Sequence, residues 1–291
     1  MIKIDGLTKK YPGGKGIDNL SFTVDPGEVF GFLGPNGAGK TTTLRILMGF
    51  IHPDRGIARI KGRDTIEERT ALKSLVGYLP GELHFFEHLS GRDLLRLIMG
   101  MHGGDRELKQ KCDSLIQRFD LDIGQKIHKM SKGMKQKLGI IAAFMLNAEV
   151  LLLDEPTSGL DPLMQKTFIE LIQEEQERGT TILMSSHQFP EIEKTCQRVA
   201  IIRDGNLLTV ADIGSLNRMK CQIFDIRAEN EKAAAFLRQS KLPIVHQNGL
   251  WFNVAISGDL SVLWQILSQT RISEFHQRPL ELEDTFMQYY R

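Results

Sequence analysis

The chain has 291 residues, 41% of them hydrophobic, which is enough for one large α/β domain and a small appended domain. Lys and Arg total 37 against 36 Asp and Glu, so the charge balance offers no bulk attraction to nucleic acid. The three cysteines, Cys112, Cys196 and Cys221, lack metal-ligand spacing and do not support zinc or redox chemistry. No apolar run approaches the ~20 residues that span a bilayer, so any membrane role is expected to come through a partner.

The start of the chain is predicted to form antiparallel strands that lead into a nucleotide-binding core. Apolar and polar residues alternate at 2–4 and 21–24, which is typical of half-buried strands, and an Asp-Pro-Gly turn follows. Residues 28–33 are predicted to form a short apolar strand, and residues 42–50 have the pattern of a buried helix. A strand and a helix therefore flank residues 34–42.

These flanked residues are typical of a phosphate-binding loop. They are Gly34, Pro35, Asn36, Gly37, Ala38, Gly39, Lys40, Thr41 and Thr42. Glycines permit positive φ, so that successive N–H groups turn inward and form an anion site at a helix N-terminus. We expect Lys40 to reach the β- and γ-phosphates of a nucleoside triphosphate and the Thr41 hydroxyl to ligate Mg²⁺. The alternative, an ordinary glycine-rich turn, is disfavoured by the correct flanks on both sides.

The middle of the chain, from residue 65 to about 148, has a largely helical pattern. Apolar residues form stripes at 94–98 and 115–119, which predicts amphipathic helices. We therefore expect a helical insertion at about residues 82–148.

Three segments are continuous apolar runs, typical of strands buried on both faces of a parallel sheet. They are residues 150–153, 181–184 and 199–202. A helix is expected at 165–178, between the first two. Asp204 and Gly205 predict a hairpin turn, after which the nucleotide-binding domain is expected to close near Asp212.

The C-terminal stretch has a separate pattern of predicted strands and helices, in the order β-α-β-β-α-β of a ferredoxin-like unit. The expected elements are strands at 222–227, 244–246, 250–254 and 271–275 and helices at 231–239 and 260–268. This stretch carries no chemical motif. It is therefore expected to be an interaction or regulatory module that holds the protomers or a partner in register.

Two carboxylates, Asp154 and Glu155, follow the apolar run that ends at residue 153. Ligands of open α/β sheets bind at the carboxyl ends of the strands, so both acids are expected at the site. Asp154 is expected to hold Mg²⁺, and Glu155 to orient or deprotonate the water that attacks the γ-phosphate. The alternative is that two acids merely begin a helix, where the helix dipole favours them.

With Ser158, Gly159, Leu160 and Asp161 directly after these acids, the chain resembles the nucleotide-binding subunit of an ATP-binding cassette (ABC) transporter over residues 1–212. The resemblance implies a P-loop NTPase core with an antiparallel β-subdomain and a helical subdomain. In that family the stretch 130–136 corresponds to the signature sequence that precedes a helix.

The resemblance also implies roles for four further residues. Ser131 and Gly133 would contact the γ-phosphate of ATP bound to the other protomer, at a helix N-terminus; a plain serine N-cap is compatible with this role. His187 matches the histidine that reaches the γ-phosphate and the attacking water, although a lone histidine is more often structural. Tyr11 matches the aromatic residue that stacks on adenine, and packing on the β-strands is its alternative role.

The chain departs from the family pattern at two places. Gly81 stands where the family usually carries a glutamine that contacts Mg²⁺ and water, so Glu82 or a water substitutes for it, or the coupling differs. Lys132 and Met134 stand where glycine and glutamine are commoner in the signature. This signature form, together with segment 278–286, resembles a branch of exporters with an ABC-2 type permease.

The chain is therefore expected to be α/β, with an ABC nucleotide-binding domain at 1–214 and a small α+β domain at 215–291. The resemblance implies an ATPase with ATP and Mg²⁺, a head-to-tail homodimer or a pair with another cassette subunit, and no nucleic acid partner. It further implies cytoplasmic localisation, on the inner face of the membrane, through a separate ABC-2 type permease whose coupling helix sits near 82–97. The transported substrate is left open, because the permease binds it.

Two other functions stay open. A soluble cassette ATPase clamps nucleic acid or ribosomes, but such proteins usually carry two cassettes or a long coiled coil, and this chain has one Lys40 loop and no sustained heptads. A module that switches on bound nucleotide with little hydrolysis is disfavoured by Glu155 and His187, whereas Gly81 is compatible with it.

Overall fold

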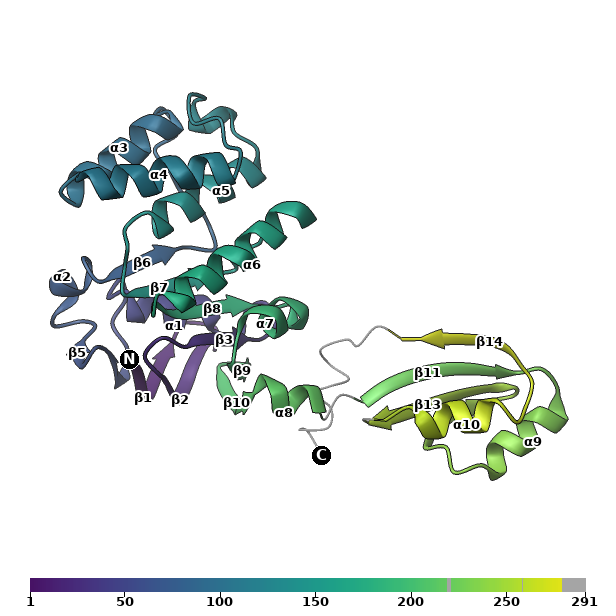
Figure 1. Cartoon of the computed structure of the whole chain (residues 1–291). Coiled ribbons are helices and arrows are strands. Elements are labelled where there is room, and N and C mark those ends of the chain that lie inside the picture. The colour runs from purple at the N-terminus through teal and green to yellow at the C-terminus, as the bar shows by residue number, and fades with distance from the viewer. Residues whose placement is uncertain (219–220, 258, 279–291) are drawn as a thin grey trace. The chain divides into compact units, whose positions relative to one another are not determined.

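The computed structural model describes residues 1–218, 221–257 and 259–278, with the side chains of 216–218, 221 and 257 left out of the account (Figure 1). Contacts divide the chain into two compact units, Met1–Asp212 and a second unit that begins at Ile213. No helix of the described residues is both long and apolar enough to cross a membrane.

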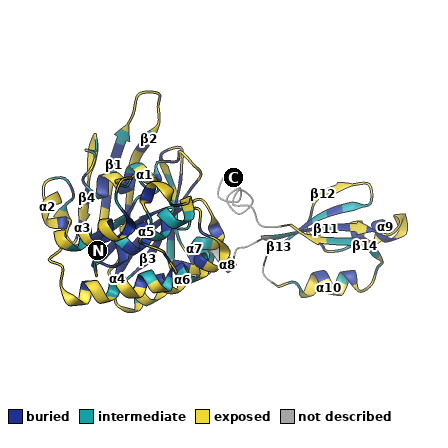
Figure 2. Ribbon diagram, turned by 90° about the horizontal axis from the view of Figure 1, so that it is seen from above, coloured by how far each residue is buried: buried dark blue, intermediate teal, exposed yellow. Residues whose placement is uncertain are grey.

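A six-stranded sheet, in the order β10-β9-β3-β8-β7-β6, forms the centre of the larger unit. Its strands are β3 (Val29–Leu33), β6 (Val76–Leu79), β7 (Val150–Asp154), β8 (Thr181–Ser186), β9 (Arg198–Arg203) and β10 (Asn206–Asp212). All neighbours are parallel except β10, which pairs antiparallel with β9. Every residue of β3, β7 and β8 is buried, which confirms the parallel strands that the apolar runs predict. Figure 2 shows buried residues gathered in the interior of this unit.

Three helices of this unit follow strands of the sheet. They are α1 (Lys40–Leu47), α6 (Pro162–Glu177) and α7 (Phe189–Thr195). The sequence starts α6 with a capping residue and a proline: the Asp161 carboxylate accepts a hydrogen bond from the Met164 N–H at 2.9 Å, and Pro162 occupies the first turn. The Asp204-Gly205 hairpin is confirmed, with φ values of 49° and 80° that a tight primed turn requires.

A second, antiparallel sheet in the order β2-β1-β4-β5 packs against the first. Its strands are β1 (Ile2–Lys10), β2 (Gly16–Val24), β4 (Arg55–Ile60) and β5 (Arg63–Asp64), and α2 (Arg69–Leu72) follows β5. One hydrophobic core joins the two sheets, where the Phe22 ring of β2 stacks on Phe30 of β3 at 5.4 Å between ring centroids. This core fixes β1 and β2 beside the start of α1.

A helical layer lies between β6 and β7 in the sequence and is seen at the top of Figure 1. It contains α3 (Gly91–Met101), α4 (Arg106–Arg118), a 3₁₀ turn at Ile127–Lys129 and α5 (Lys132–Phe144). The residues 82–148, where apolar stripes predict helices, include all of them. Ser90 and Asp93 cap α3 reciprocally, because each side chain accepts a hydrogen bond from the other's backbone N–H.

The second unit has the predicted β-α-β-β-α-β order. After α8 (Ile213–Arg218) come β11 (Cys221–Ala228), α9 (Glu231–Gln239), β12 (Ile244–Asn248), β13 (Trp251–Ser257), α10 (Ser261–Leu267) and β14 (Ile272–Gln277). The four strands form an antiparallel sheet in the order β12-β13-β11-β14, which is the ferredoxin-like order. The segment 278–286 lies, apart from Arg278, outside the described residues.

Candidate functional site

The site residues lie where three adjacent parallel strands end. β8 lies between β3 and β7, so the loops after these strands meet at one edge of the sheet. Leu33 of β3 is opposite Ser186 of β8, and Ser185 is opposite Asp154 of β7. Segments separated by more than a hundred positions in the sequence therefore share one ligand-binding edge.

The loop after β3 has the geometry of an anion site. Gly37 and Gly39 have φ values of 84° and 106°, in the region that favours glycine. A Cβ at Gly34 would lie 2.3 Å from the Ile202 carbonyl oxygen, so this backbone passes too close for a side chain. The Lys40 Nζ is buried and donates to the carbonyl oxygens of Gly34 at 2.7 Å and Pro35 at 3.2 Å.

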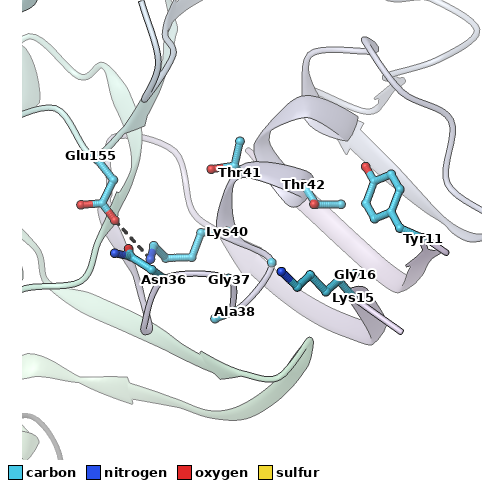
Figure 3. Close-up of a pocket in the computed structure, with 11 residues that line it drawn as sticks. Tyr11, Lys15, Gly16, Asn36, Gly37, Ala38, Lys40, Thr41, Thr42 and Glu155 are labelled. Atoms are coloured by element: carbon cyan, nitrogen blue, oxygen red, sulfur yellow. Dashed lines mark ion pairs between the residues drawn. The ribbon is translucent and has the colours of Figure 1, made fainter. Parts of the chain in front are cut away.

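A cavity of about 300 Å³ lies over this loop (Figure 3). Its lining residues are Tyr11, Lys15, Gly16, Asn36, Gly37, Ala38, Gly39, Lys40, Thr41, Thr42 and Glu155. The structure thus brings the predicted aromatic residue, most of the predicted loop and one predicted acid to a single cavity. Gly34 and Pro35 support the loop from outside the lining.

Glu155 occupies the centre of a charged cluster. Its carboxylate lies 3.1 Å from Lys40 Nζ and 2.6 Å from the Nδ1 of His187, which follows β8 (Figure 3 for the lysine). Its backbone has a φ of 48° and is held by hydrogen bonds from its N–H to the carbonyl and hydroxyl oxygens of Ser185. A strained non-glycine conformation of this kind is typical of functional sites, and here it aims an acid at the cavity.

Asp154 and Thr41 meet beside this cluster. The Thr41 hydroxyl donates to one Asp154 oxygen at 2.7 Å, and the Ser185 hydroxyl donates to the other at 2.5 Å. Asp154 is fully buried, and hydroxyl and carboxylate oxygens are the ligands that Mg²⁺ prefers. No cluster of three or more His, Cys, Asp or Glu that could hold a metal occurs in the described chain, so a magnesium ion here needs ligands from the nucleotide and from water.

Tyr11 lies in the turn between β1 and β2. The Tyr11 N–H donates to the Lys15 carbonyl oxygen at 2.9 Å, which closes the turn, and Tyr11 as a whole residue is 37% exposed. Lys9 Nζ lies 6.0 Å from the ring centroid on one side. An exposed ring that lines the cavity is available for stacking, rather than being packed on the strands as in its alternative role.

The predicted signature residues lie outside the cavity lining in this single chain. Ser131 is the N-cap of α5 and accepts a hydrogen bond from the Met134 N–H at 3.2 Å. Gly133 is close to the loop after β7: a Cβ there would lie 2.9 Å from the Gly159 carbonyl oxygen. The buried Gln136 Nε2 donates to the Pro156 carbonyl oxygen at 2.7 Å. The start of α5 is thus tied to the residues that follow Glu155.

Gly81 lies against the carboxylate of Asp154. A Cβ at this position would be 3.1 Å from Asp154 Oδ2, so a side chain here would meet the predicted metal ligand directly. The Glu82 side chain is 81% exposed and its carboxylate lies 3.6 Å from His84 Nε2. In this conformation Glu82 is paired at the surface rather than held at Asp154.

Two groups close to the site have shifted pKa values. Burial raises the pKa of Tyr78 to about 12, and the negative charge of Asp154 adds to this shift. Burial also raises the pKa of Glu191, whose Oε2 accepts a 2.5 Å hydrogen bond from the Ser186 hydroxyl. Through this hydrogen bond, the carboxyl group of Glu191 is held next to the residue that precedes His187.

Sequence reasoning missed three residues of this site. Lys15 and Gly16 line the cavity, and Ser185 binds both Asp154 and the backbone of Glu155. The pair Ser185-Ser186 at the end of an apolar run is a signal that could have found the serine. No pattern around Lys15 distinguishes it from other surface lysines.

Comparison with known proteins agrees with this geometry. The ABC transporter family model matches residues 17–158. The bacitracin transport ATP-binding protein BcrA of Bacillus licheniformis is 35% identical over 260 residues, which cover 86% of this chain and 83% of that protein. The chain belongs to the ABC transporter ATP-binding proteins. It is an ATP-binding and ATP-hydrolysing subunit of an ABC transporter, as its resemblance to that family implies.

Two further ABC proteins extend the comparison. The Nod factor export ATP-binding protein I of Paraburkholderia xenovorans (strain LB400) is 31% identical and covers 98% of this chain and 95% of its own length. A solved structure of the ATP-binding subunit of an ABC transporter superposes with a TM-score of 0.70 at 29% identity, covering 75% of this chain and 92% of that chain. The ABC cassette fold is therefore established for most of the chain.

Proposed function

We propose that this ABC subunit powers export through a separate ABC-2 type permease, on the cytoplasmic face of the membrane. A relative named for Nod factor export supports this direction of transport. The altered signature around Lys132 is the sequence feature that favours the ABC-2 branch. The balanced charge gives no reason to add a nucleic acid partner.

The proposed active unit is a head-to-tail dimer, either of two copies or with a paired cassette subunit. The cavity over the phosphate-binding loop is lined by one chain, whereas Ser131 and Gly133 at the start of α5 lie outside its lining. In the dimer, these residues would supply N–H groups and a hydroxyl to the γ-phosphate bound by the partner. Each protomer would then hold half of each ATP site.

Within one protomer, the nucleotide would lie along the cavity. Tyr11 would stack on the adenine, because its ring is exposed at one end of the lining. The loop from Gly34 to Thr42 would surround the phosphates with N–H groups, and Lys40 would bind the β- and γ-phosphates. Asp154 and Thr41 would hold Mg²⁺, which neutralises negative charge on the phosphates when it is bound.

Glu155 and His187 would carry out the hydrolytic step. The Glu155 carboxylate would accept a proton from the attacking water, and the His187 ring, 2.6 Å away, would hold that carboxylate in position. The observation that carries this proposal is the placement of Glu155 against both Lys40 and His187 at the cavity. A structural acid at the start of a helix would not need a strained backbone.

Contact with the permease would involve residues 82–97. This segment follows Gly81, whose backbone lies beside the Asp154 carboxylate, and it continues into α3. A movement at the metal ligand would therefore reach the proposed permease contact through a few residues. Because Gly81 brings no side chain, this path would run through the backbone rather than through a glutamine.

The Glu155→Gln variant tests this function. Its turnover is expected to fall by about 10²-fold or more, because an amide cannot accept the proton of the attacking water. With Mg²⁺ and ATP it is expected to convert from monomer to dimer in light scattering, while the wild type returns to monomer after hydrolysis. The matched control is Glu174→Gln on the exposed side of α6, where the acid pairs with Arg118, and its turnover is expected to be unchanged.

Other outcomes separate the alternatives. Unchanged turnover in Glu155→Gln would remove Glu155 from its proposed role. Loss of turnover without an ATP-dependent dimer would contradict the composite site. If the wild type and Glu155→Gln dimerised equally with ATP, and the wild type showed no measurable hydrolysis, the module that switches on bound nucleotide would instead be favoured.

A further inference from the structure

Lys15 is a cation of the cavity for which the proposed function has no role. It lies in the turn between β1 and β2, and its exposed side chain lines the cavity together with the phosphate-binding loop. Figure 3 shows the side chain extending from the side of the cavity that holds Tyr11 toward the loop of Gly37. Its position was set by the fold, not by a sequence motif.

The neighbouring lysines are engaged, and Lys15 is not. Lys9 pairs with Asp54 at 2.8 Å, Lys10 pairs with Asp18 at 3.0 Å, and Lys40 pairs with Glu155. The Lys15 ammonium has no hydrogen-bond or ion-pair partner among the residues that the structure describes. A lysine that faces a phosphate-binding loop without a partner of its own is available to an anionic ligand.

The backbone of this turn has a fixed conformation, which determines where the Lys15 side chain leaves the chain. Gly16, the next residue, has a φ of 142°, and a Cβ there would lie 1.9 Å from the Lys9 carbonyl oxygen. Only glycine fits at that position. The Tyr11 N–H bond to the Lys15 carbonyl oxygen closes the other side of the turn at 2.9 Å. Tyr11 and Lys15 are therefore presented to the cavity as one unit.

We propose that Lys15 binds the α-phosphate of ATP. This assignment rests on the proposed function, which places adenine on Tyr11 and the β- and γ-phosphates at Lys40. In a nucleoside triphosphate the α-phosphate lies between the base and the terminal phosphates, and Lys15 extends into the cavity between those two groups. The hydrogen bond from the Lys15 ammonium to the α-phosphate is charge-assisted. It binds the nucleotide at a phosphate that Lys40 does not reach.

Calorimetric titration of the full chain with ATP and with ADP, in EDTA so that turnover does not interfere, tests the assignment. Lys15→Gln is expected to weaken both nucleotides by the same factor of about three- to tenfold, since both carry an α-phosphate. Lys15→Arg is expected to restore most of the affinity. The matched control, Lys10→Gln, removes the same charge from the end of β1 that leads into this turn, outside the cavity lining, and it is expected to change neither affinity.

Three results would overturn the assignment. Equal weakening by Lys15→Gln and Lys10→Gln would show a general charge effect. Weakening of ATP alone would place Lys15 at the γ-phosphate, and unchanged binding of both nucleotides would leave it without a contact. Failure of the Glu155→Gln protein to bind ATP with Mg²⁺ present would instead contradict the proposed function itself, so the two failures are distinguishable.

Discussion

Glu191 is a residue whose burial has a predictable effect on stability. It lies on α7, four residues after His187, and the hydrogen bond from the Ser186 hydroxyl only partly offsets the loss of water around its carboxylate. Its pKa is therefore raised above the ordinary value of 4.5. Because the folded protein then binds this proton more tightly than the unfolded chain does, the free energy of unfolding falls as the pH rises from about 4.5 through the raised pKa.

Glu191→Gln should remove this dependence. The amide is uncharged at every pH and its oxygen can still accept the Ser186 hydrogen bond, so the variant is expected to melt at a higher temperature than the wild type at pH 7.5. Its melting temperature is also expected to vary less with pH above 4.5. Melting curves across that range measure both effects, with Glu177→Gln at the exposed end of α6 as the control. A lower melting temperature at pH 7.5 would show that the Glu191 charge is needed in the native state.

The sequence predicts the location of site residues that directly follow a buried strand. It does not predict the location of site residues that lie in a turn. Asp154, Glu155 and His187 were predicted at the site because their strands end there, and the structure puts them together. Their catalytic and metal-binding roles stay predictions. Lys15 was missed, because its position depends on packing of the β1–β2 turn over a loop about 20 positions away, which no local pattern encodes.

At the scale of elements, α5 and the loop after β7 form one connected piece. The Gln136 side chain is buried and donates to the Pro156 carbonyl oxygen, and Gly133 packs against Gly159. A buried carbonyl group that loses its donor is costly, because water does not replace it.

Gln136→Leu is accordingly expected to lower the free energy of unfolding by about 1–3 kcal/mol. Gln165→Leu is the matched control, since the same amide group donates to the Leu160 carbonyl oxygen in a more exposed setting at 3.2 Å, where water can take its place. Urea unfolding measures both variants. If the two substitutions had equal effects, the burial of the Gln136 bond would not explain its contribution.

The strands β4 and β5 escaped prediction for a physical reason. Together they contain three Arg and one Asp, and most of their residues are exposed to solvent. Their sequences therefore contain no continuous apolar run that would predict a strand. They form because β1 offers an unpaired edge to β4 and the core accepts Ala58 and Ile60. The buried strands β3, β7 and β8 needed no such partner to be recognised.

At the scale of the whole molecule, the nucleotide site belongs entirely to the larger unit. All residues that line the cavity lie within Met1–Asp212, whereas Phe224, Ile226 and Phe252 belong to a separate hydrophobic core in the second unit. The domain boundary predicted from the sequence, at residue 214, lies two residues after the end of β10, and the contacts divide the chain after Asp212.

Truncation after Asp212 is therefore expected to leave ATP affinity unchanged and to weaken assembly. Calorimetric ATP binding and ATP-dependent dimerisation in a Glu155→Gln background measure the two properties, with circular dichroism as the control for folding. A folded truncation that no longer bound ATP would contradict the separation of the units. Undiminished dimerisation and permease association would contradict the role predicted for the second unit.

The position of β3 in its sheet has a consequence for synthesis of the chain. Both neighbours of β3, β8 and β9, come late in the sequence, and all five β3 residues are buried in the finished protein. At 5–20 residues per second, the roughly 150 residues between β3 and β8 take about 7–30 s to emerge from the ribosome. For that time the strand that leads into the nucleotide loop has neither of its sheet partners, so the nascent chain exposes an apolar segment that is prone to aggregation.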